Sequence, residues 1–285
     1  MEDLYPSALA HLIRESYTQI HRDGVAPTGM RTAIISLLYK EKGERFNLQN
    51  YRSIAVDNAV EKILEKCMEI CIRPLLPHLI SPEQQAFQPD KKILENTQLV
   101  QDLIAYCNAN SISRIILFCD QDQDNSYPRV KWNFILMVMG KMGIHVDFIR
   151  MIDIMYKDAT FKMKVNSHVV EGFHPTNGVA QGSPLSPILY LLVIQSYISL
   201  LNISPNVESI SVPGPGEDKN NCRSLKAGAF ADNLNLFLRN TNQLTPFRAL
   251  LAKYENASGA VNSWPKTFGL RLGTSGGPTS SQPDG

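Results

Sequence analysis

The stretch GAFADNLNLFL, residues 228–238, has the clearest pattern of strand and turn in the sequence. It places an acid, Asp232, and an amide, Asn233, between two short apolar runs. Apolar runs on both sides of such a turn signal predict a β-hairpin, because Asp and Asn tolerate the left-handed backbone of tight turns. Asp232 is therefore either an ordinary turn residue or one member of a site whose second acid lies elsewhere.

Two further acids, Asp120 and Asp122, lie at and just after the end of the buried-type strand RIILFCD, residues 114–120. Carboxylates that end neighbouring strands can hold divalent cations, and hard oxygen ligands suit Mg²⁺, which also accepts phosphate oxygens. Two such ions about 4 Å apart clamp the attacking and leaving oxygens of a phosphoryl transfer. We therefore expect this strand and the 228–238 hairpin to be neighbours in one antiparallel sheet.

The remaining patterns mix helices and strands without a regular strand–helix–strand repeat, which favours the α+β class. Two strand signals are a run at 32–40 and a hairpin at 161–173 that turns at Asn166 and Ser167. Residues 202–222 read as a loop, and 273–285 as a disordered low-complexity tail. Apolar spacing predicts helices at 4–20, 58–74, 96–108 (capped by Asn96 or Thr97), 129–142 (with Pro128 in its first turn), 146–157, 187–201 and 244–257.

Composition limits the function classes. The 285 residues suit one large domain or two smaller ones, and 28 basic residues against 27 acidic ones create no global field that would attract nucleic acid. Only the segment 129–166 leans basic. Five cysteines without a CxxC motif indicate reduced thiols of an intracellular protein, in the cytoplasm or nucleus. No secretory signal is visible, and the apolar run 188–201 reads as too short and too polar to span a membrane.

Six blocks, in order, resemble the reverse transcriptase domain of non-LTR (LINE-type) retrotransposons between about residues 25 and 267. One such motif would be weak, whereas six in the same order make chance agreement very unlikely. The blocks are RTAIISLLYKEKGERFNLQNYRSIAV, SPEQQAFQPDKKILENTQLVQDLI, FCDQDQDNSYPRVKW, NGVAQGSPLSPILY, FADN and ASGAVNSWPKT.

This resemblance implies a polymerase right-hand fold, with fingers, an antiparallel palm sheet and a largely missing thumb. It also implies an RNA-directed DNA polymerase that adds dNTPs to a DNA primer on an RNA template, with Mg²⁺ as cofactor and Mn²⁺ as the alternative ion. The expected organisation is an N-terminal helical extension at 1–24, a fingers and palm domain at 25–270, and a disordered tail at 271–285. A copy without endonuclease and thumb would be a truncated one.

The resemblance assigns the metal ligands to Asp232 and to one of the two acids in the first catalytic block. Spacing to Tyr127 favours Asp122, whereas the end of the strand favours Asp120. Tyr127 itself matches the aromatic residue that screens the sugar 2′ position. Lys266 matches the late lysine proposed as a general acid for the pyrophosphate leaving group.

Four further positions match residues that contact the nucleotide or template. Arg52 matches the fingers arginine that faces the nucleotide phosphates, a role suited to a fixed guanidinium, and Lys40 has a similar place. Gln181 and Gly182 match the loop that lies along the nucleotide and the template.

The sequence also departs from the family pattern. Asn233 stands where the family has a second acid, which removes a negative charge beside the metals. The other departures are Asn125 for lysine, Pro128 for aspartate, Ser53 for proline, Ala180 for arginine, and Asp90-Lys91 for Gly-Arg. Together they indicate a degenerate copy. Two alternatives therefore stay open: a catalytically dead remnant that at most binds RNA, and an unrelated α+β interaction domain.

Overall fold

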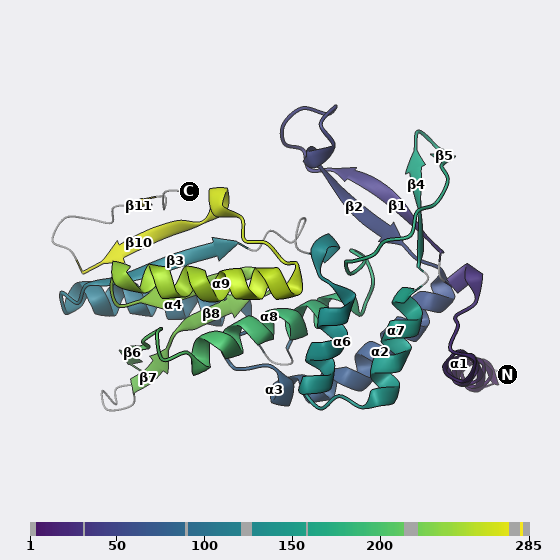
Figure 1. Cartoon of the computed structure of the whole chain (residues 1–285), viewed down its shortest axis with the longest axis horizontal. Coiled ribbons are helices and arrows are strands. Elements are labelled where there is room, and N and C mark those ends of the chain that lie inside the picture. Colours follow the sequence, from purple (N-terminus) through teal and green to yellow (C-terminus); the bar gives the residue numbers. More distant parts are fainter. Residues whose placement is uncertain are drawn as a thin grey trace. The chain divides into compact units, whose positions relative to one another are not determined.

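The chain folds into two compact units, each built from two separate segments (Figure 1). The first unit comprises Met1–Pro74 and Val130–Leu189, and the second comprises Leu75–Arg129 and Tyr190–Gly285. A computed structural model describes residues 4–30, 32–88, 91–120, 127–157, 159–213, 222–273 and 280–281.

The first unit combines helices with a four-stranded sheet of order β2-β1-β4-β5. β1 pairs with β2 antiparallel and with β4 parallel, and β4 turns into β5 through Asn166 and Ser167, whose φ angles are 48° and 68°. This left-handed turn is the one expected from the sequence. The elements are α1 (Leu4–Asp23), η1 (Thr28–Met30), β1 (Thr32–Tyr39), η2 (Leu48–Asn50), β2 (Tyr51–Val56), α2 (Ala59–Ile72), α6 (Trp132–Lys141), α7 (Val146–Lys157), β4 (Thr160–Val165) and β5 (His168–Val169).

The second unit is organised around a five-stranded sheet of order β11-β10-β3-β9-β8, in which every pair of neighbours is antiparallel. Its elements are α3 (Leu76–Leu79), α4 (Ile93–Ala109), β3 (Arg114–Asp120), η4 (Tyr127–Arg129), β6 (Ile210–Pro213), β7 (Cys222–Leu225), β8 (Ala227–Phe230), β9 (Asn233–Leu238), η5 (Thr241–Gln243), α9 (Leu244–Ser258), η6 (Trp264–Lys266), β10 (Phe268–Leu272) and β11 (Ser280–Ser281). The chain passes from one unit to the other three times: within η3 (Arg73–Leu75), between Arg129 and Val130, and within α8 (Ser186–Ile203).

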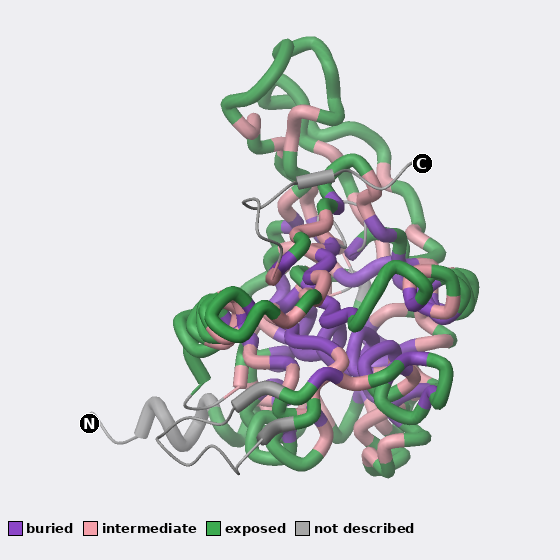
Figure 2. The backbone as a smooth tube through the Cα atoms, turned by 90° about the vertical axis from the view of Figure 1, so that its left-hand side faces the viewer, coloured by how far each residue is buried: buried purple, intermediate pink, exposed green. Residues whose placement is uncertain are grey.

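Helices cover both faces of this sheet. On one face, Ile116 and Phe237 pack in a cluster with Leu103 and Cys107 of α4. On the other face, Leu117 and other side chains of β3 line a cavity with residues of α9. A strand buried on both faces needs apolar residues at nearly every position, which explains the continuous apolar run before Asp120. In Figure 2, buried residues gather toward the interior, and exposed residues lie toward the outside on loops and on some helices.

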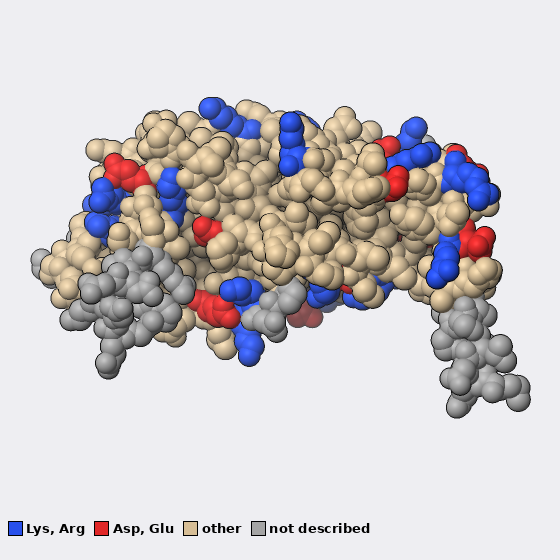
Figure 3. Space-filling view, turned by 90° about the horizontal axis from the view of Figure 1, so that it is seen from below, with Lys and Arg blue, Asp and Glu red and all other residues tan. Residues whose placement is uncertain are grey.

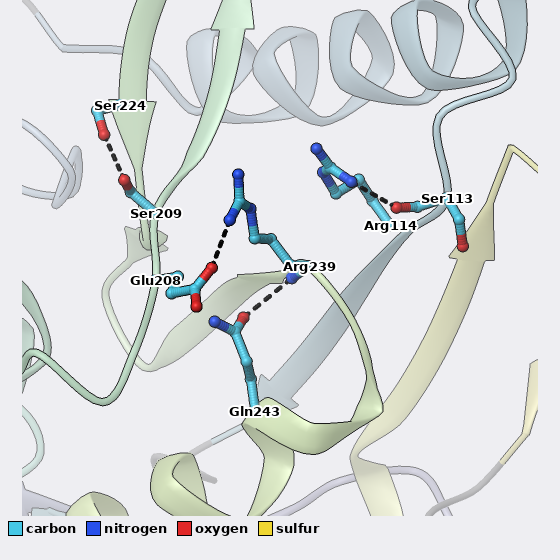
Figure 4. A network of polar contacts seen from close by, with 7 residues as sticks. All are labelled: Ser113, Arg114, Glu208, Ser209, Ser224, Arg239 and Gln243. Atoms are coloured by element: carbon cyan, nitrogen blue, oxygen red, sulfur yellow. Dashed lines mark hydrogen bonds and ion pairs between the residues drawn. The ribbon is translucent and has the colours of Figure 1, made fainter.

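A polar network closes the end of this sheet where β9 finishes (Figure 4). The Arg239 guanidinium forms an ion pair with Glu208 at 2.5 Å, and the Arg239 backbone N–H donates to the Gln243 side chain at 2.9 Å. Ser224 donates to Ser209 at 2.5 Å, which connects β7 with the segment before β6. The network lies at the opposite end of β9 from Asn233.

Three predictions of local structure need correction. α4 begins at Ile93 and not at Asn96, because the buried Asn96 side chain accepts a hydrogen bond from Asn235 of β9 instead of capping the helix. Pro128 lies in η4, and the following helix α6 begins only at Trp132. Residues 202–222 are not only loop, since β6 pairs with β7 in a two-stranded sheet.

α8 is the apolar helix that the sequence suggested was too short and too polar for a membrane. Its 18 residues have a mean hydropathy of 1.5, so the helix is long and apolar enough to cross a bilayer. The prediction that it is too short and too polar is therefore wrong. However, 67% of the helix is buried inside the fold, which accounts for its apolar character. At its end, the Lys226 ammonium donates to the carbonyls of Leu201, Asn202 and Ser204, as suits a cation at a helix C-terminus.

Two further features predicted from the sequence are the state of the cysteines and the C-terminal tail. Among the described residues, Cys67, Cys71, Cys107 and Cys119 carry free thiols. Ser280 and Ser281 of the low-complexity tail pair with β10, whereas residues 274–279 and 282–285 lie outside the described part of the chain.

Candidate functional site

The acid and amide of the 228–238 hairpin lie at one end of the sheet in the second unit. Phe230, the last residue of β8, pairs with Asn233, the first residue of β9, and Ala231 and Asp232 form the turn between them. Asn233 in turn pairs with Asp120, the last residue of β3. Residues directly opposite each other in antiparallel strands point to the same face, so Asp120 and Asn233 share a face.

The expected neighbourhood of the two strands is therefore confirmed. Asp120, Asp232 and Asn233 meet at one end of the sheet, and we call this group the sheet-end site. Asp122, the other predicted ligand in the first catalytic block, belongs to residues 121–126, which lie outside the described residues.

A buried glutamine holds the turn that carries Asp232. Gln84 is completely buried, and its side-chain oxygen accepts from the backbone N–H groups of Ala231 and Ala86, both at 3.0 Å. Its side-chain nitrogen donates to the Ala231 carbonyl at 3.1 Å. Ala231 has a φ of 55°, which is uncommon for a residue with a Cβ atom. The two-way bond to Gln84 supplies a reason why alanine keeps this conformation.

The segment around Gln84 also adjoins β8 through its backbone. The Ala229 N–H donates to the Glu83 carbonyl at 2.7 Å, and the Gln85 N–H donates to the Ala229 carbonyl at 2.9 Å. Gln84 lies in the SPEQQAF block, where the sequence pattern predicts no role for it. Because Glu83 and Gln85 on either side are also polar, the sequence does not single out Gln84, and only tertiary contacts show what it binds.

Lys266 reaches the sheet-end site from the C-terminal side. Its ammonium lies 3.5 Å from the Asp120 carboxylate, with 52% of the lysine side chain and 27% of the aspartate side chain exposed. The Ser263 N–H donates to the Asp120 carbonyl at 2.8 Å, which attaches this segment to the end of β3. The buried Asn262 side chain donates to the Thr267 hydroxyl at 3.0 Å and so stiffens the turn that presents Lys266.

Tyr127 also belongs to the second unit. It is 3% exposed, and its ring centroid lies 4.6 Å from that of Tyr190. In this state the tyrosine predicted to screen the sugar is part of the core.

The other predicted substrate contacts lie in the first unit. Arg52 is exposed on β2, opposite Leu38, and the Lys40 ammonium donates to the Gln49 carbonyl at 3.1 Å. The Gln181 carbonyl accepts from the Ala55 N–H at 2.8 Å, so the loop is tied to β2.

Gly182 shows why this loop needs glycine. Its φ is 121°, and a Cβ atom there would lie 2.6 Å from the Ala55 carbonyl oxygen. The loop and β2 thus approach each other as closely as their backbones allow. The resemblance predicted a functional loop at this point, and the structure adds the strand against which it is held.

The comparison with protein families decides what the chain is related to. The sequence profile of the family described as reverse transcriptase (RNA-dependent DNA polymerase) matches residues 39–274. The chain belongs to the reverse transcriptase family.

Relatives and solved structures agree with this membership. The reverse transcriptase chain is 26% identical over 257 residues to the Transposon TX1 uncharacterized 149 kDa protein of Xenopus laevis, covering 90% of the chain and 19% of that protein. It is 23% identical over 264 residues to the retrovirus-related Pol polyprotein from the type-1 retrotransposable element R2 of Popillia japonica, covering 92% of the chain and 35% of the polyprotein. The chain thus spans about a fifth and about a third of these relatives.

Structural neighbours include apo telomerase from Candida tropicalis truncated from its C-terminal domain, with a TM-score of 0.58 and 12% identity over 89% of this chain and 52% of that one. Telomerase from the same yeast in complex with a TWJ fragment of telomeric RNA gives a TM-score of 0.58 and 12% identity over 95% of this chain and 46% of that one. The chain has the polymerase right-hand fold of these neighbours.

Charged side chains of both signs are mixed on the visible surface of the chain. On the face seen in Figure 3, Lys and Arg side chains are interspersed with Asp and Glu, in line with the balanced composition.

Asp120, Asp232 and Asn233 offer two carboxylates and one neutral oxygen, which are the oxygen ligands that a divalent cation prefers. Within the described ranges, no group of three or more His, Cys, Asp or Glu side chains is placed to hold a metal ion.

Proposed function

We propose that the chain is the polymerase core of an RNA-directed DNA polymerase, and that its sheet-end site carries out nucleotidyl transfer at a rate reduced by Asn233. The observation that carries the proposal is the register of β3 and β9, which brings Asp120 beside the turn with Asp232. The partners are an RNA template, a DNA primer and dNTPs. The profile match over residues 39–274 supports the same reaction class.

In this reaction the primer 3′-hydroxyl oxygen attacks the α-phosphorus of the nucleotide. The bond from that phosphorus to the bridging oxygen breaks, and pyrophosphate leaves. Divalent cations, Mg²⁺ or Mn²⁺, would offset the negative charge on the triphosphate and on both reacting oxygens when bound. Asp232 and an acid of the first catalytic block, Asp120 or Asp122, would hold them.

The chain's other residues would bind and orient the substrate. The Arg52 guanidinium on β2 would face the nucleotide phosphates, with Lys40 beside it in a similar role. The loop at Gln181 and Gly182, fixed against Ala55, would lie along the nucleotide and template. The Lys266 ammonium lies beside Asp120 and carries N–H groups, so it would give a proton to the departing pyrophosphate.

A second function is supported by a specific observation. Asn233 lacks the charge of a second acid, and the Lys266 ammonium already lies 3.5 Å from Asp120. A site with fewer negative charges and a resident cation favours nucleic-acid binding without turnover. That function would depend on basic side chains and would weaken steeply with salt, because bound phosphates release counterions.

Primer extension tests the proposal. Purified chain, an RNA template with an annealed DNA primer and dNTPs are incubated with Mg²⁺ or with Mn²⁺, for the natural chain and for Asn233→Asp. We expect extension by Asn233→Asp that disappears with EDTA and with Asp232→Ala. Retention of template–primer binding without extension in either chain would leave only the binding function. Extension that survives Asp232→Ala would disprove the assignment of the site.

A Mg²⁺ titration of dNTP binding distinguishes the two candidate acids of the first catalytic block. We expect Asp122→Ala to abolish metal-dependent dNTP binding and Asp120→Ala to retain much of it, because of the spacing between Asp122 and Tyr127. The reverse result in a Mg²⁺ titration would assign the ligand to Asp120.

A further inference from the structure

The first unit contains a small cavity lined by three acids, Asp57, Glu61 and Glu65. They lie four residues apart, at the start and along one side of α2, so all three point into the same space. The cavity has a volume of about 30 Å³ and opens to solvent. We call it the acidic cavity. Its other walls are Ala33, Trp132, Met155, Tyr156, Ala159, Phe161, Pro175, Gly178 and Ala180.

Each of the three acids has an oxygen without a partner. Oδ2 of Asp57, Oε2 of Glu61 and Oε2 of Glu65 are buried and accept no hydrogen bond. Glu65 is only 5% exposed. Buried acids are rare unless they are paired, so this concentration of unsatisfied oxygens points to a missing ligand.

The electrostatics indicate the charge of that ligand. Burial, reinforced by the negative charges of Asp57 and Glu65, raises the pKa of Glu61 to about 8. Burial raises the pKa of Glu65 to about 7. A hydrogen bond from the Ser183 hydroxyl and the positive charge of Lys62 act in the opposite direction and lower it. Burial likewise raises the pKa of Asp57, against the attraction of Lys62. Acids this close repel one another when ionised, and a cation between them would remove the repulsion.

The walls indicate the kind of cation. No group of three or more His, Cys, Asp or Glu in the described parts of the chain is arranged for a metal ion, and this includes the three acids. The rings of Trp132 and Tyr156 lie 5.7 Å apart at an angle of 59° beside the carboxyl groups. Aromatic faces next to carboxylates suit nitrogen cations, which bind the ring faces and donate N–H bonds to the acids.

We propose that the acidic cavity binds the cationic end of an ammonium or guanidinium compound. Its volume of about 30 Å³ admits an ammonium group or one edge of a guanidinium group, so the charged end enters and the rest of the compound stays in the open mouth. Ala180 leaves room there, because its side chain is a single methyl group in the wall. The site goes beyond nucleotidyl transfer, since its residues belong to the first unit and none of them is a proposed ligand of the sheet-end site.

Occupation of the cavity acts on the neighbouring loop. Gly178 and Ala180 form one wall, and the next residue, Gln181, accepts the bond from Ala55 of β2. A cation bound between α2 and this wall therefore joins the loop to the helix. We expect it to stiffen the segment that carries Gln181 and Gly182.

The test uses Trp132 as the reporter. The chain has two tryptophans, so Trp264→Phe leaves Trp132 as the only one. The full chain is titrated at pH 8.5 and constant ionic strength with methylammonium and with methylguanidinium. Tetramethylammonium, which has charge but no N–H, and NaCl are the controls. We expect a saturable fluorescence change and a rise in Tm of about 2–4 °C with the first two compounds.

Two variants make the test specific. Glu65→Gln should weaken binding about 10-fold, as expected for loss of one charge-assisted hydrogen bond. Glu171→Gln, the same change at an exposed residue of the first unit, should leave it unaltered. Ala180→Lys supplies the cation from the chain itself, so we expect a higher Tm and no further response to methylammonium.

Acetyl-lysine amide and acetyl-arginine amide identify the source of the cation. Their binding supports a lysine or arginine side chain of a protein segment, whereas binding of the methyl compounds alone supports a free small cation. An equal response to tetramethylammonium or NaCl, or no response at all, would overturn the proposal and leave a water-filled cavity. If Glu65→Gln does not fold, two measurements still test the proposal. They are the cation titration of the Trp264→Phe chain and the Tm of Ala180→Lys.

Discussion

Acidic side chains gather in two regions of the chain, and the surroundings of the two groups differ. At the sheet-end site, Asp120 is 27% exposed and has the Lys266 ammonium at 3.5 Å. In the acidic cavity, Glu65 is 5% exposed, and three carboxyl oxygens have no hydrogen-bond partner. The first group has a cation but, at Asn233, lacks an acid, whereas the second has three acids whose charge Lys62 offsets only in part. The same residue type thus gives two different chemistries, according to burial and counter-charge.

The largest expected effect restores the missing charge at the sheet end. Asn233→Asp should raise the rate of Mg²⁺-dependent primer extension by ~10²–10³, because one preorganised electrostatic group is worth about that factor. Mn²⁺, which is less demanding of geometry, should support the natural chain better than Mg²⁺ does. Single-turnover extension rates measure both effects.

The control for this gain is Asn242→Asp, which makes the same change at an exposed residue of the second unit. It should leave the rate unaltered. A natural chain that already extends primers as fast as Asn233→Asp would show that Asn233 is no lesion, and the comparison between the two acidic groups would lose its basis.

The next effect concerns the support of Asp232. Gln84→Leu should lower the free energy of unfolding by about 2–4 kcal/mol, because it leaves the buried Ala231 and Ala86 N–H groups without acceptors. Urea unfolding measures the change, and Gln101→Ala, at an exposed position of α4, is the matched control. A loss no larger than that of Gln101→Ala would mean that water or another group replaces Gln84.

The pH dependence of stability distinguishes the acidic cavity from the sheet-end site. The pKa values of Glu61 and Glu65 are raised to about 8 and about 7 in the folded chain, so the folded state retains protons that the unfolded state releases. Their stabilising contribution is complete below the unfolded pKa, near pH 4.5, and is lost as the pH rises to about 8. After allowance for solvent screening, we expect a loss on the order of 2 kcal/mol.

Urea unfolding between pH 5 and pH 8.5 checks this dependence. Glu65→Gln should flatten the profile relative to the natural chain, and Glu171→Gln should leave it unchanged. A natural profile that rises over this range, with Glu65→Gln parallel to it, would contradict the buried, unpaired state of these acids.

The smallest effect is expected for the ion pair at the sheet end. Lys266→Gln should change the free energy of unfolding by less than about 1 kcal/mol, because pairs exposed to solvent contribute little. In the Asn233→Asp background it should nevertheless lower the extension rate ~10²-fold or more, if Lys266 gives the proton to pyrophosphate. A large loss of stability without a loss of rate would make Lys266 a structural residue.

Sequence alone determined much of the fold and part of the site. Apolar periodicity located β3 at 114–120 and α7 at 146–157, and the turn chemistry at Asn166–Ser167 and at Asp232 located two hairpins. These signals are local, since a strand or a tight turn is fixed by neighbouring residues. The ordered motifs supplied the family, which the profile over 39–274 bears out.

The partners of these elements become visible only in the folded chain. The tertiary structure paired Asp120 with Asn233, brought Lys266 to Asp120, and placed Gln84 under the turn of Asp232. It also moved the start of α4 to Ile93, since Asn96 bonds to a strand far along the chain. The acids of the cavity look in the sequence like the solvated face of an amphipathic helix. Burial and missing partners depend on what packs against that face, and residues distant in the chain supply those contacts.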